Sequence, residues 1–295
     1  SRFGSSNCSR SPEQRGSPSM KTPIHYCLSL GPSCHAAEFL RGHALALRRF
    51  ALPFDYIHSD PAVICRCLGD GCKAFLDRRE LAPWPGVGSG SLHRQLRTAE
   101  HAYIFNHHNP AGCDADFAHF HRAADRLRRV LGEESSRALM LHLEVNAAAG
   151  EPARDAFVAG ARAIYASLRQ RTSNFVLAAV RVVPRGAAEG GEHGAQELLL
   201  GECAEEAAGL LVLELRSLTR TVVPFAPFGR TPAAAQAAPE EQANERADLA
   251  ALTAAIDARF DFQVRPEPPP ATACTDAARA ACGPRWVWAE PAAIG

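Results

Sequence analysis

The sequence lacks an excess of charge of either sign: 32 Lys and Arg residues balance 32 Asp and Glu residues over 295 positions. This balance gives no electrostatic reason to expect a nucleic acid or a membrane surface as a partner. No apolar run is long enough to cross a bilayer, and residues 1–20 contain no apolar stretch that resembles the core of a secretory signal. We therefore expect an intracellular, cytoplasmic protein that binds neither nucleic acid nor a membrane.

The two ends of the sequence lack the apolar periodicity of folded elements. Residues 1–22 are rich in Ser, Arg, Gly and Pro, which predicts a disordered leader, with an organelle transit peptide as the alternative. The first residue is not methionine, which leaves open that the chain is a fragment or that Met20 is the native start. Residues 264–295 are rich in proline and predict a disordered tail. A single domain is therefore expected over residues 23–263.

Paired CxxC motifs are lacking too, although the sequence contains ten cysteines. In a chain of this length without a secretory signal, reduced thiols are expected rather than disulfides. Cys65, Cys67 and Cys72 resemble a zinc cluster only loosely, because no second pair follows and the spacing is not that of zinc ligands. The cysteines therefore predict neither a disulfide framework nor a metal centre, and we expect no cofactor.

Short apolar runs alternate with amphipathic segments along most of the sequence. The apolar runs predict strands at 24–30, 102–105, 138–146, 174–183 and 209–217. Helical spacing predicts helices at 34–41, 60–77, 114–134, 155–172 and 246–262. This alternation indicates parallel βαβ units, hence a single-domain α/β fold with a mostly parallel wound sheet flanked by helices. In such sheets, ligands bind beyond the carboxyl ends of the strands.

Cys34 is the first candidate, because it directly follows a predicted strand and the turn of Gly31 and Pro32. Ser33 is the predicted N-cap, which places Cys34 in the first turn of a helix. The helix dipole and the unpaired N–H groups there favour a thiolate, so we expect a thiol pKa below the ordinary value of about 8.5. The same N–H groups could stabilise an oxyanion. The alternative is a small buried core thiol.

Asn106, His107 and His108 form the second candidate group, in a polar segment that follows the predicted strand 102–105. Neighbouring side chains on an extended chain point in opposite directions, so one histidine is expected to face a site. We favour His107 as the general base that deprotonates Cys34. The alternative is a solvated loop with an Asn-Pro turn.

Several other polar residues are weaker candidates. Asp55 either orients a histidine, as the third member of a triad does, or pairs with Arg48 or Arg49. His35 either contacts substrate or is exposed on the helix surface. Two residues lie at the end of the predicted strand 138–146, namely Glu144 and Asn146. Three further histidines are given structural roles: His142 in the core, and His119 and His121 facing solvent.

Three segments resemble a domain family of unknown function that is described as papain-like cysteine peptidases. They are SLGPSC (29–34), LPFDYI (52–57) and FNHHNP (105–110). Family members typically carry a Ser-Leu-Gly-x-x-Cys turn, a Pro-Phe-Asp-Trp-type segment and Phe-Asn-His-His followed by Asp-Pro. The resemblance covers residues 24–146 and continues weakly to 262, with Tyr56 in place of Trp and Asn109 in place of Asp.

The resemblance implies that Cys34 is the nucleophile, that His107 or His108 is the base, and that Asp55 is a motif residue. The leading hypothesis is therefore a cysteine-dependent hydrolase or acyl-transfer enzyme acting on a small-molecule, peptide or glycan-linked substrate. A non-enzymatic module that binds a glycan or anion is the alternative, and a metal site of Cys34, His107 and His108 is a third. Expected substrate-binding residues are Ser33, His35, Asn106 and Asn146. The sequence assigns no oligomeric state.

Overall fold

A computed structural model describes most of the predicted domain. The described residues are 21–84, 90–98, 101, 103–105, 107–185, 194–197, 209–219 and 239–267. The leader up to residue 20, the tail beyond residue 267 and the candidate Asn106 lie outside them.

The central sheet has five strands in the order β2 (Tyr26–Ser29), β5 (Ala138–Val145), β6 (Phe175–Val183), β8 (Leu210–Arg216) and β7 (Gly194–Glu197). The first four strands run parallel, and β7 pairs antiparallel with β8 at one edge. Every residue of β6 is buried, as expected for a strand covered on both faces. The prediction of an α/β fold with a mostly parallel sheet is confirmed.

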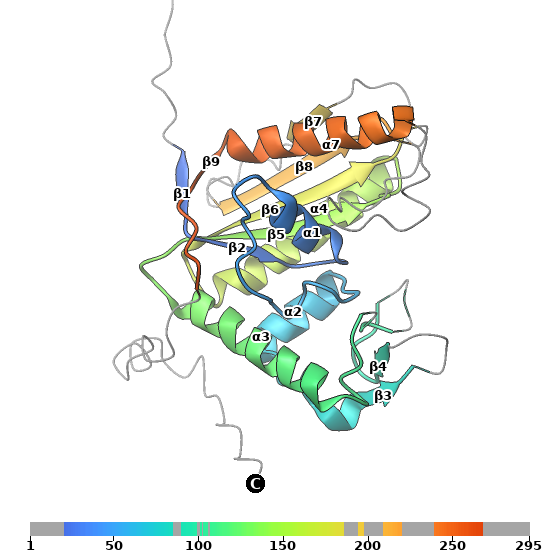
Figure 1. The fold of residues 1–295 in the computed structure, drawn as a ribbon, viewed down its shortest axis with the longest axis vertical. Coiled ribbons are helices and arrows are strands. Elements are labelled where there is room, and N and C mark those ends of the chain that lie inside the picture. Colours follow the sequence, from blue (N-terminus) through green and yellow to red (C-terminus); the bar gives the residue numbers. More distant parts are fainter. Residues whose placement is uncertain are drawn as a thin grey trace, which may run out of the picture.

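Helices cover both faces of this sheet, so the fold has three layers with the sheet in the middle (Figure 1). One apolar core joins the sheet to α1 (His35–Gly42) and α7 (Pro239–Asp257). The core on the opposite face contains residues of α2 (Pro61–Asp70), α3 (Asp114–Gly132) and α4 (Glu151–Arg169). The predicted helices therefore became the outer layers because each buries apolar residues in one of these two cores.

Two small sheets and one short helix were not predicted. Strand β1 (Thr22–Ile24) pairs in parallel with β9 (Phe260–Phe262), which brings the two ends of the described domain together. Strand β3 (Leu81–Pro83) pairs antiparallel with β4 (Ser91–His93), directly after a 3-10 turn at Arg78–Glu80. The expected leader boundary at residue 22 falls within β1.

The predicted strand at 102–105 is absent from the central sheet. Phe105 instead forms an isolated antiparallel bridge with Ser91, and residue 102 lies outside the described residues. The Phe105 ring packs with its centroid 5.2 Å from that of Phe75 and 4.9 Å from that of Phe120. Ile104 and Phe105 are therefore buried in a loop, where aromatic packing holds Phe105, and the prediction of a sheet strand was wrong.

Two predicted helices end five or more residues earlier than expected. The predicted helix 60–77 stops at Asp70 because Gly71 adopts a left-handed conformation, with φ of 66°, and donates its N–H to the carbonyl of Cys67. Asp60 caps the start of α2, as predicted, by accepting a hydrogen bond of 2.8 Å from the N–H of Val63. The segment 246–262 divides into the end of α7 and strand β9.

The connections after β2 and β5 run to opposite faces of the sheet. The chain after β2 enters α1 on one face, whereas the chain after β5 enters α4 on the other. Gly31 follows β2 with φ of 79°, and its carbonyl accepts a hydrogen bond of 3.0 Å from the N–H of Leu143. This divergence is a topological switch point, where ligands of open α/β sheets bind. Cys34 lies beside it.

We expect Gly31→Ala to lower the free energy of unfolding by roughly 2–4 kcal/mol. A Cβ atom at Gly31 would lie 2.1 Å from the Oγ of buried Ser59, and the positive φ disfavours a side chain. Urea unfolding measures the change. Gly69→Ala is the matched control, because its Cβ meets nothing within 4 Å on the surface of α2, and it should stabilise by up to about 1 kcal/mol.

The double variant Gly31→Ala, Ser59→Ala separates the steric contact from the backbone strain. It should recover part of the loss, because the clashing hydroxyl is gone while the unfavourable φ remains. Equal stability of Gly31→Ala and the unmodified protein would contradict the described turn.

Candidate functional site

Cys34 is the N-cap of α1, and its thiol is partly exposed and not in a disulfide. The predicted Ser33 cap was wrong by one residue, because α1 begins at His35 and no side chain caps it. The Ser33 hydroxyl is instead hydrogen-bonded to Nδ1 of the His35 ring. Cys34 therefore lies at the start of a helix whose first N–H groups have no side-chain acceptor.

The pKa of the Cys34 thiol is raised, which contradicts the predicted lowering. Burial is the main cause, and the negative charge of Glu38 adds to it. Glu38 follows Cys34 by four residues, so both side chains lie on the same face of the helix. A carboxylate at this distance opposes the helix dipole, and α1 has only eight residues. Cys34 is therefore a neutral thiol at neutral pH.

Glu38 is the charged centre of this region, and the sequence analysis missed it. It is buried, accepts a 2.6 Å hydrogen bond from the Tyr56 hydroxyl, and pairs with Arg41. Burial and this hydrogen bond raise the pKa of Tyr56 to about 12. The charge of Glu38 also acts to raise the pKa of both Cys34 and His107. The four-residue spacing from Cys34 was the signal that could have identified it.

His107 and His108 lie in different surroundings. The His107 ring meets Tyr56 edge-on, with centroids 5.7 Å apart. His107 is exposed as a residue, but partial burial of its ring, followed by the nearby His108, lowers its pKa. Nδ1 of His108 lies 3.2 Å from Oδ1 of Asp116, and its ring stacks on His119 at 5.0 Å. His107 is thus a neutral imidazole beside Glu38 and Tyr56, whereas His108 belongs to a group at the start of α3.

The Cys34 thiol forms no hydrogen bond with either histidine among the described residues. Cys34 and His107 are connected through Glu38, which acts electrostatically on both. The strand expected to carry the histidines to the sheet edge is absent, so the Tyr56 contact positions His107 instead.

Asp55 does not orient a histidine. Its Oδ2 accepts hydrogen bonds of 2.9 Å from Nε of Arg48 and 2.8 Å from the N–H of Leu52, so the pairing alternative is the observed one. Asp55 is 2% exposed, and its burial raises the carboxyl pKa despite the opposing effect of Arg48. The Arg48 guanidinium also lies 5.3 Å from the centroid of the Tyr56 ring. Asp55 therefore supports the site through Arg48 and Tyr56.

Four histidines gather near the turn that carries Cys34, and two of them were not predicted. His58 packs on His101 with ring centroids 3.7 Å apart. Burial lowers the pKa of His58 to about 4, and the nearby His101, His107 and His35 contribute. Burial alone lowers the pKa of His35 to about 4, so this residue is not the exposed surface histidine of the alternative prediction. The His58 and His35 rings are therefore uncharged at neutral pH.

The remaining candidates at the strand ends lie elsewhere. Asn146 is exposed at the end of β5 with φ of 56°. His142 is a core residue, as predicted, with Nδ1 3.4 Å from the Leu30 carbonyl oxygen and its ring stacked on Phe157. Contrary to the expectation of solvent-facing rings, His119 and the other α3 histidine, His121, are both partly buried.

A metal centre has no support in this part of the chain. Among the described ranges, no three His, Cys, Asp or Glu side chains converge to hold a metal ion. The alternative of Cys34, His107 and His108 as metal ligands is therefore dropped. Cys65, Cys67 and the nearby Cys72 are free thiols.

Comparison of the chain with protein-family models, with curated proteins and with solved structures found no match. In the part of the chain that the structure covers, no helix combines the length and apolar character needed to cross a membrane. The fold and site define an α/β protein with a thiol at a strand–helix junction, near the uncharged imidazoles of His35 and His58 and the buried carboxylate of Glu38.

We expect Asp55→Ala to destabilise the protein by about 3–5 kcal/mol, because it leaves the Arg48 guanidinium unpaired in a mostly buried position. Chemical unfolding measures this change. A double variant, Arg48→Met with Asp55→Leu, should lose much less because no charge is left unpaired. Native stability of Asp55→Ala would contradict the buried ion pair.

We expect acidification from pH 6.5 to 4 to remove on the order of 3 kcal/mol of stability through His142. Burial lowers the pKa of His142 from 6.5 to about 4 in the folded protein. The folded state therefore binds fewer protons than the unfolded state in this window, and the stability present above pH 6.5 is lost as pH falls. Unfolding free energies of the protein and of His142→Gln should converge toward pH 4, and parallel curves would contradict the shift.

Proposed function

We propose that the protein is a cysteine-dependent hydrolase or acyl-transfer enzyme, with Cys34 as nucleophile and His107 as general base. The observation that carries the proposal is the shared neighbour Glu38, whose charge acts on both the Cys34 thiol and the His107 imidazole. The position of Cys34 supports it too, because the thiol follows β2 at the switch point where α/β sheets bind ligands.

The raised pKa of the Cys34 thiol and the lowered pKa of the His107 imidazole determine the protonation states from which the proposed reaction starts. Both groups are uncharged at neutral pH, so a preformed thiolate–imidazolium pair is not expected. The imidazole accepts the thiol proton as the sulfur attacks, which is general-base catalysis. Glu38 then stabilises the imidazolium that forms, because its negative charge favours the protonated ring.

The reaction proceeds in two balanced steps. The Cys34 sulfur bonds to the carbonyl carbon of the substrate while the carbonyl π pair moves to oxygen, and N–H groups at the start of α1 stabilise that oxyanion. The oxyanion collapses, the leaving group departs with the proton held by His107, and a thioester remains. Water or another acceptor attacks the thioester with His107 again taking the proton, and the thiol is restored.

Substrate must bring the thiol and the ring together, since they are not hydrogen-bonded in the unliganded chain. Catalytic contacts are often long without substrate and tighten in the complex. His107 is exposed and held by one edge-on ring contact, which permits such an adjustment. The resemblance to papain-like cysteine peptidases in the segments around Cys34 and His107 is consistent with this assignment.

A non-enzymatic binding module is the second candidate, and the neutral Cys34 thiol is the observation that favours it. In that case the uncharged histidines would supply hydrogen bonds to a glycan or an anion, without bond cleavage. Cys34→Ser would then bind the ligand as well as the unmodified protein does.

The enzyme hypothesis predicts that Cys34 is acylated by p-nitrophenyl acetate ahead of the other cysteines. Peptide mass spectrometry locates the acetyl group, and p-nitrophenol release gives the rate. Cys34→Ala should abolish the rapid phase, whereas Cys65→Ala, which removes another partly exposed thiol, should leave it intact. Equal acetylation of Cys34 and Cys65 would exclude the nucleophile assignment.

The same assay tests the base. His107→Ala should slow acylation by roughly 10²–10⁴-fold, whereas His108→Ala should have little effect. The pKa of His107 lies below its usual 6.5, so the rate should rise with pH and level off near or below that value. In His107→Ala the rate should keep rising beyond pH 9, because only the thiolate of a raised-pKa thiol reacts. Identical pH profiles would contradict the role of His107.

A further inference from the structure

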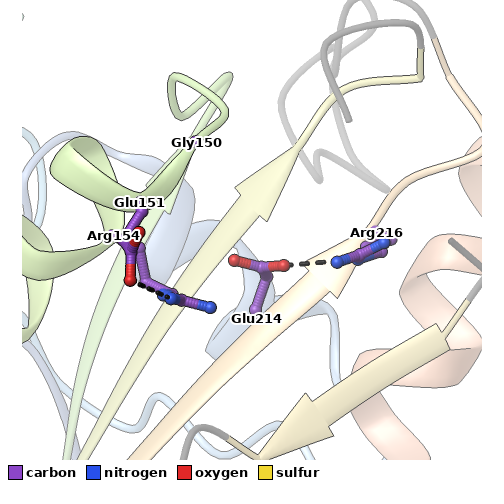
Figure 2. Close-up of a pocket in the computed structure, with 5 residues that line it drawn as sticks. All are labelled: Gly150, Glu151, Arg154, Glu214 and Arg216. Carbon is purple, nitrogen blue, oxygen red and sulfur yellow. Dashed lines mark hydrogen bonds and ion pairs between the residues drawn. The ribbon is translucent and has the colours of Figure 1, made fainter. Parts of the chain in front are cut away.

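A shallow pocket of about 230 Å³ lies at the carboxyl ends of the parallel strands, apart from Cys34 (Figure 2). Its walls come from the first turn of α4, through Gly150, Glu151 and Arg154, and from the end of β8, through Glu214 and Arg216. Figure 2 shows the Glu214 carboxylate between the two arginines. No part of the proposed mechanism uses these residues.

A buried arginine lies directly behind this pocket. Arg181 of β6 is in register with Glu214 of β8, and its neighbours Val180 and Val182 pack on the α1 and α7 face. Arg181 therefore points toward the α4 face. Its side chain is 1% exposed, Nη1 lies 3.6 Å from Oε2 of Glu214, and Nη2 donates to the carbonyl of Ala148 in the loop before α4.

The Arg181 guanidinium is incompletely satisfied within the described part of the chain. Its Nε and Nη1 atoms are buried and have no hydrogen-bond partner there. Unsatisfied buried donors are unfavourable, and those of a charged group more so. Arg181 does not itself line the pocket, but its contacts with Glu214 and with Ala148 of the loop before α4 place it behind two of the pocket walls.

The pocket wall formed by α4 also presents unsatisfied donors. Gly150 is the N-cap with φ of 94°, and no side chain caps the helix. Pro152 has no N–H and the N–H of Arg154 donates to the Gly150 carbonyl, so the backbone donors of the first turn that lack an acceptor in the helix are those of Glu151 and Ala153. The helix dipole makes this end positive. A glycine cap leaves room for a ligand to approach the backbone closely.

The two outer arginines have donor capacity to spare. Arg154 forms only a long ion pair of 3.6 Å with Glu151, whose side chain is 77% exposed and therefore well screened. Arg216 donates from Nε to Oε1 of Glu214 at 3.3 Å, and its other nitrogens have no partner in the described ranges. Glu214 is already shared by Arg181 and Arg216, so its charge is largely compensated.

We propose that this pocket binds a small oxyanion, a phosphate or carboxylate group, between Arg154, Arg216 and the start of α4. Guanidinium groups present N–H donors in a fork that matches the oxygens of both anions. Glu214 stays paired with Arg181 and Arg216 and holds the pocket floor in place. The ligand supplies the acceptors that the helix end and the two outer arginines lack.

Calorimetric titration of the full chain with inorganic phosphate, and separately with succinate, tests the proposal. Saturable binding in the millimolar range or tighter is expected for at least one anion. Arg154→Gln and Arg216→Gln should each weaken it by about tenfold or more, because each removes charge-assisted hydrogen bonds. Arg162→Gln is the matched control, because Arg162 is exposed on the same helix but does not line the pocket; it should bind like the unmodified protein.

The two titrations distinguish a phosphate ligand from a carboxylate ligand. Phosphate binding without succinate binding assigns the pocket to phosphoryl groups, the reverse assigns it to carboxylates, and binding of both assigns it to oxyanions in general. Circular dichroism confirms that each variant is folded. Absence of saturable binding for both anions, or equal affinity of all three arginine variants, would overturn the proposal. Cys34 acylation is measured separately, so failure here leaves the enzyme hypothesis unaffected.

Discussion

The divergence of the chain after β2 and β5 is the constraint on which the site depends. Four parallel strands buried on both faces hold their carboxyl ends along one edge, so each following loop starts from a fixed point. The chain leaves β2 toward one face and β5 toward the other, with Gly31 hydrogen-bonded to Leu143 between them. Cys34 therefore occupies a position that sheet packing sets, independently of any catalytic role.

The pKa of the Cys34 thiol depends more on the surrounding residues than on the dipole of its helix. A helix start alone lowers a thiol pKa, but α1 is short and carries Glu38 one turn later on the same face. Burial is the main cause of the raised thiol pKa, the charge of Glu38 adds to it, and the thiol stays neutral. His35 and His58 are neutral for the same reason, because burial disfavours the imidazolium.

Periodicity predicted the parts of the fold that follow local rules. The long apolar runs of β5 and β6 and the stripe of α3 were placed within a few residues, because their patterns repeat over several turns or a whole strand. Three-residue pairings such as β1 with β9 join segments far apart in sequence and leave no local pattern. Phe105 was assigned to a strand because burial by aromatic packing and burial in a sheet produce the same short apolar run.

Candidate site residues could be named from the sequence only where they belong to a recognisable motif. Cys34, the histidine pair and Arg48 as one of two candidate ion-pair partners of Asp55 were named from sequence, whereas the positions of Glu38 and His58 depend on tertiary contacts. The arginine pocket was not predicted from sequence either, since Arg181 lies within an apolar strand.

Strand β8 lies three strands from β2 in the sheet, which is roughly 14 Å at about 4.8 Å per strand. In solvent, a charge at that range acts on the thiol with only about 0.3 kcal/mol before salt screening. Glu38, at about 5–6 Å between Cβ atoms, is therefore the stronger of these two charges on the thiol, and an anion bound at β8 leaves the protonation of the thiol nearly unchanged.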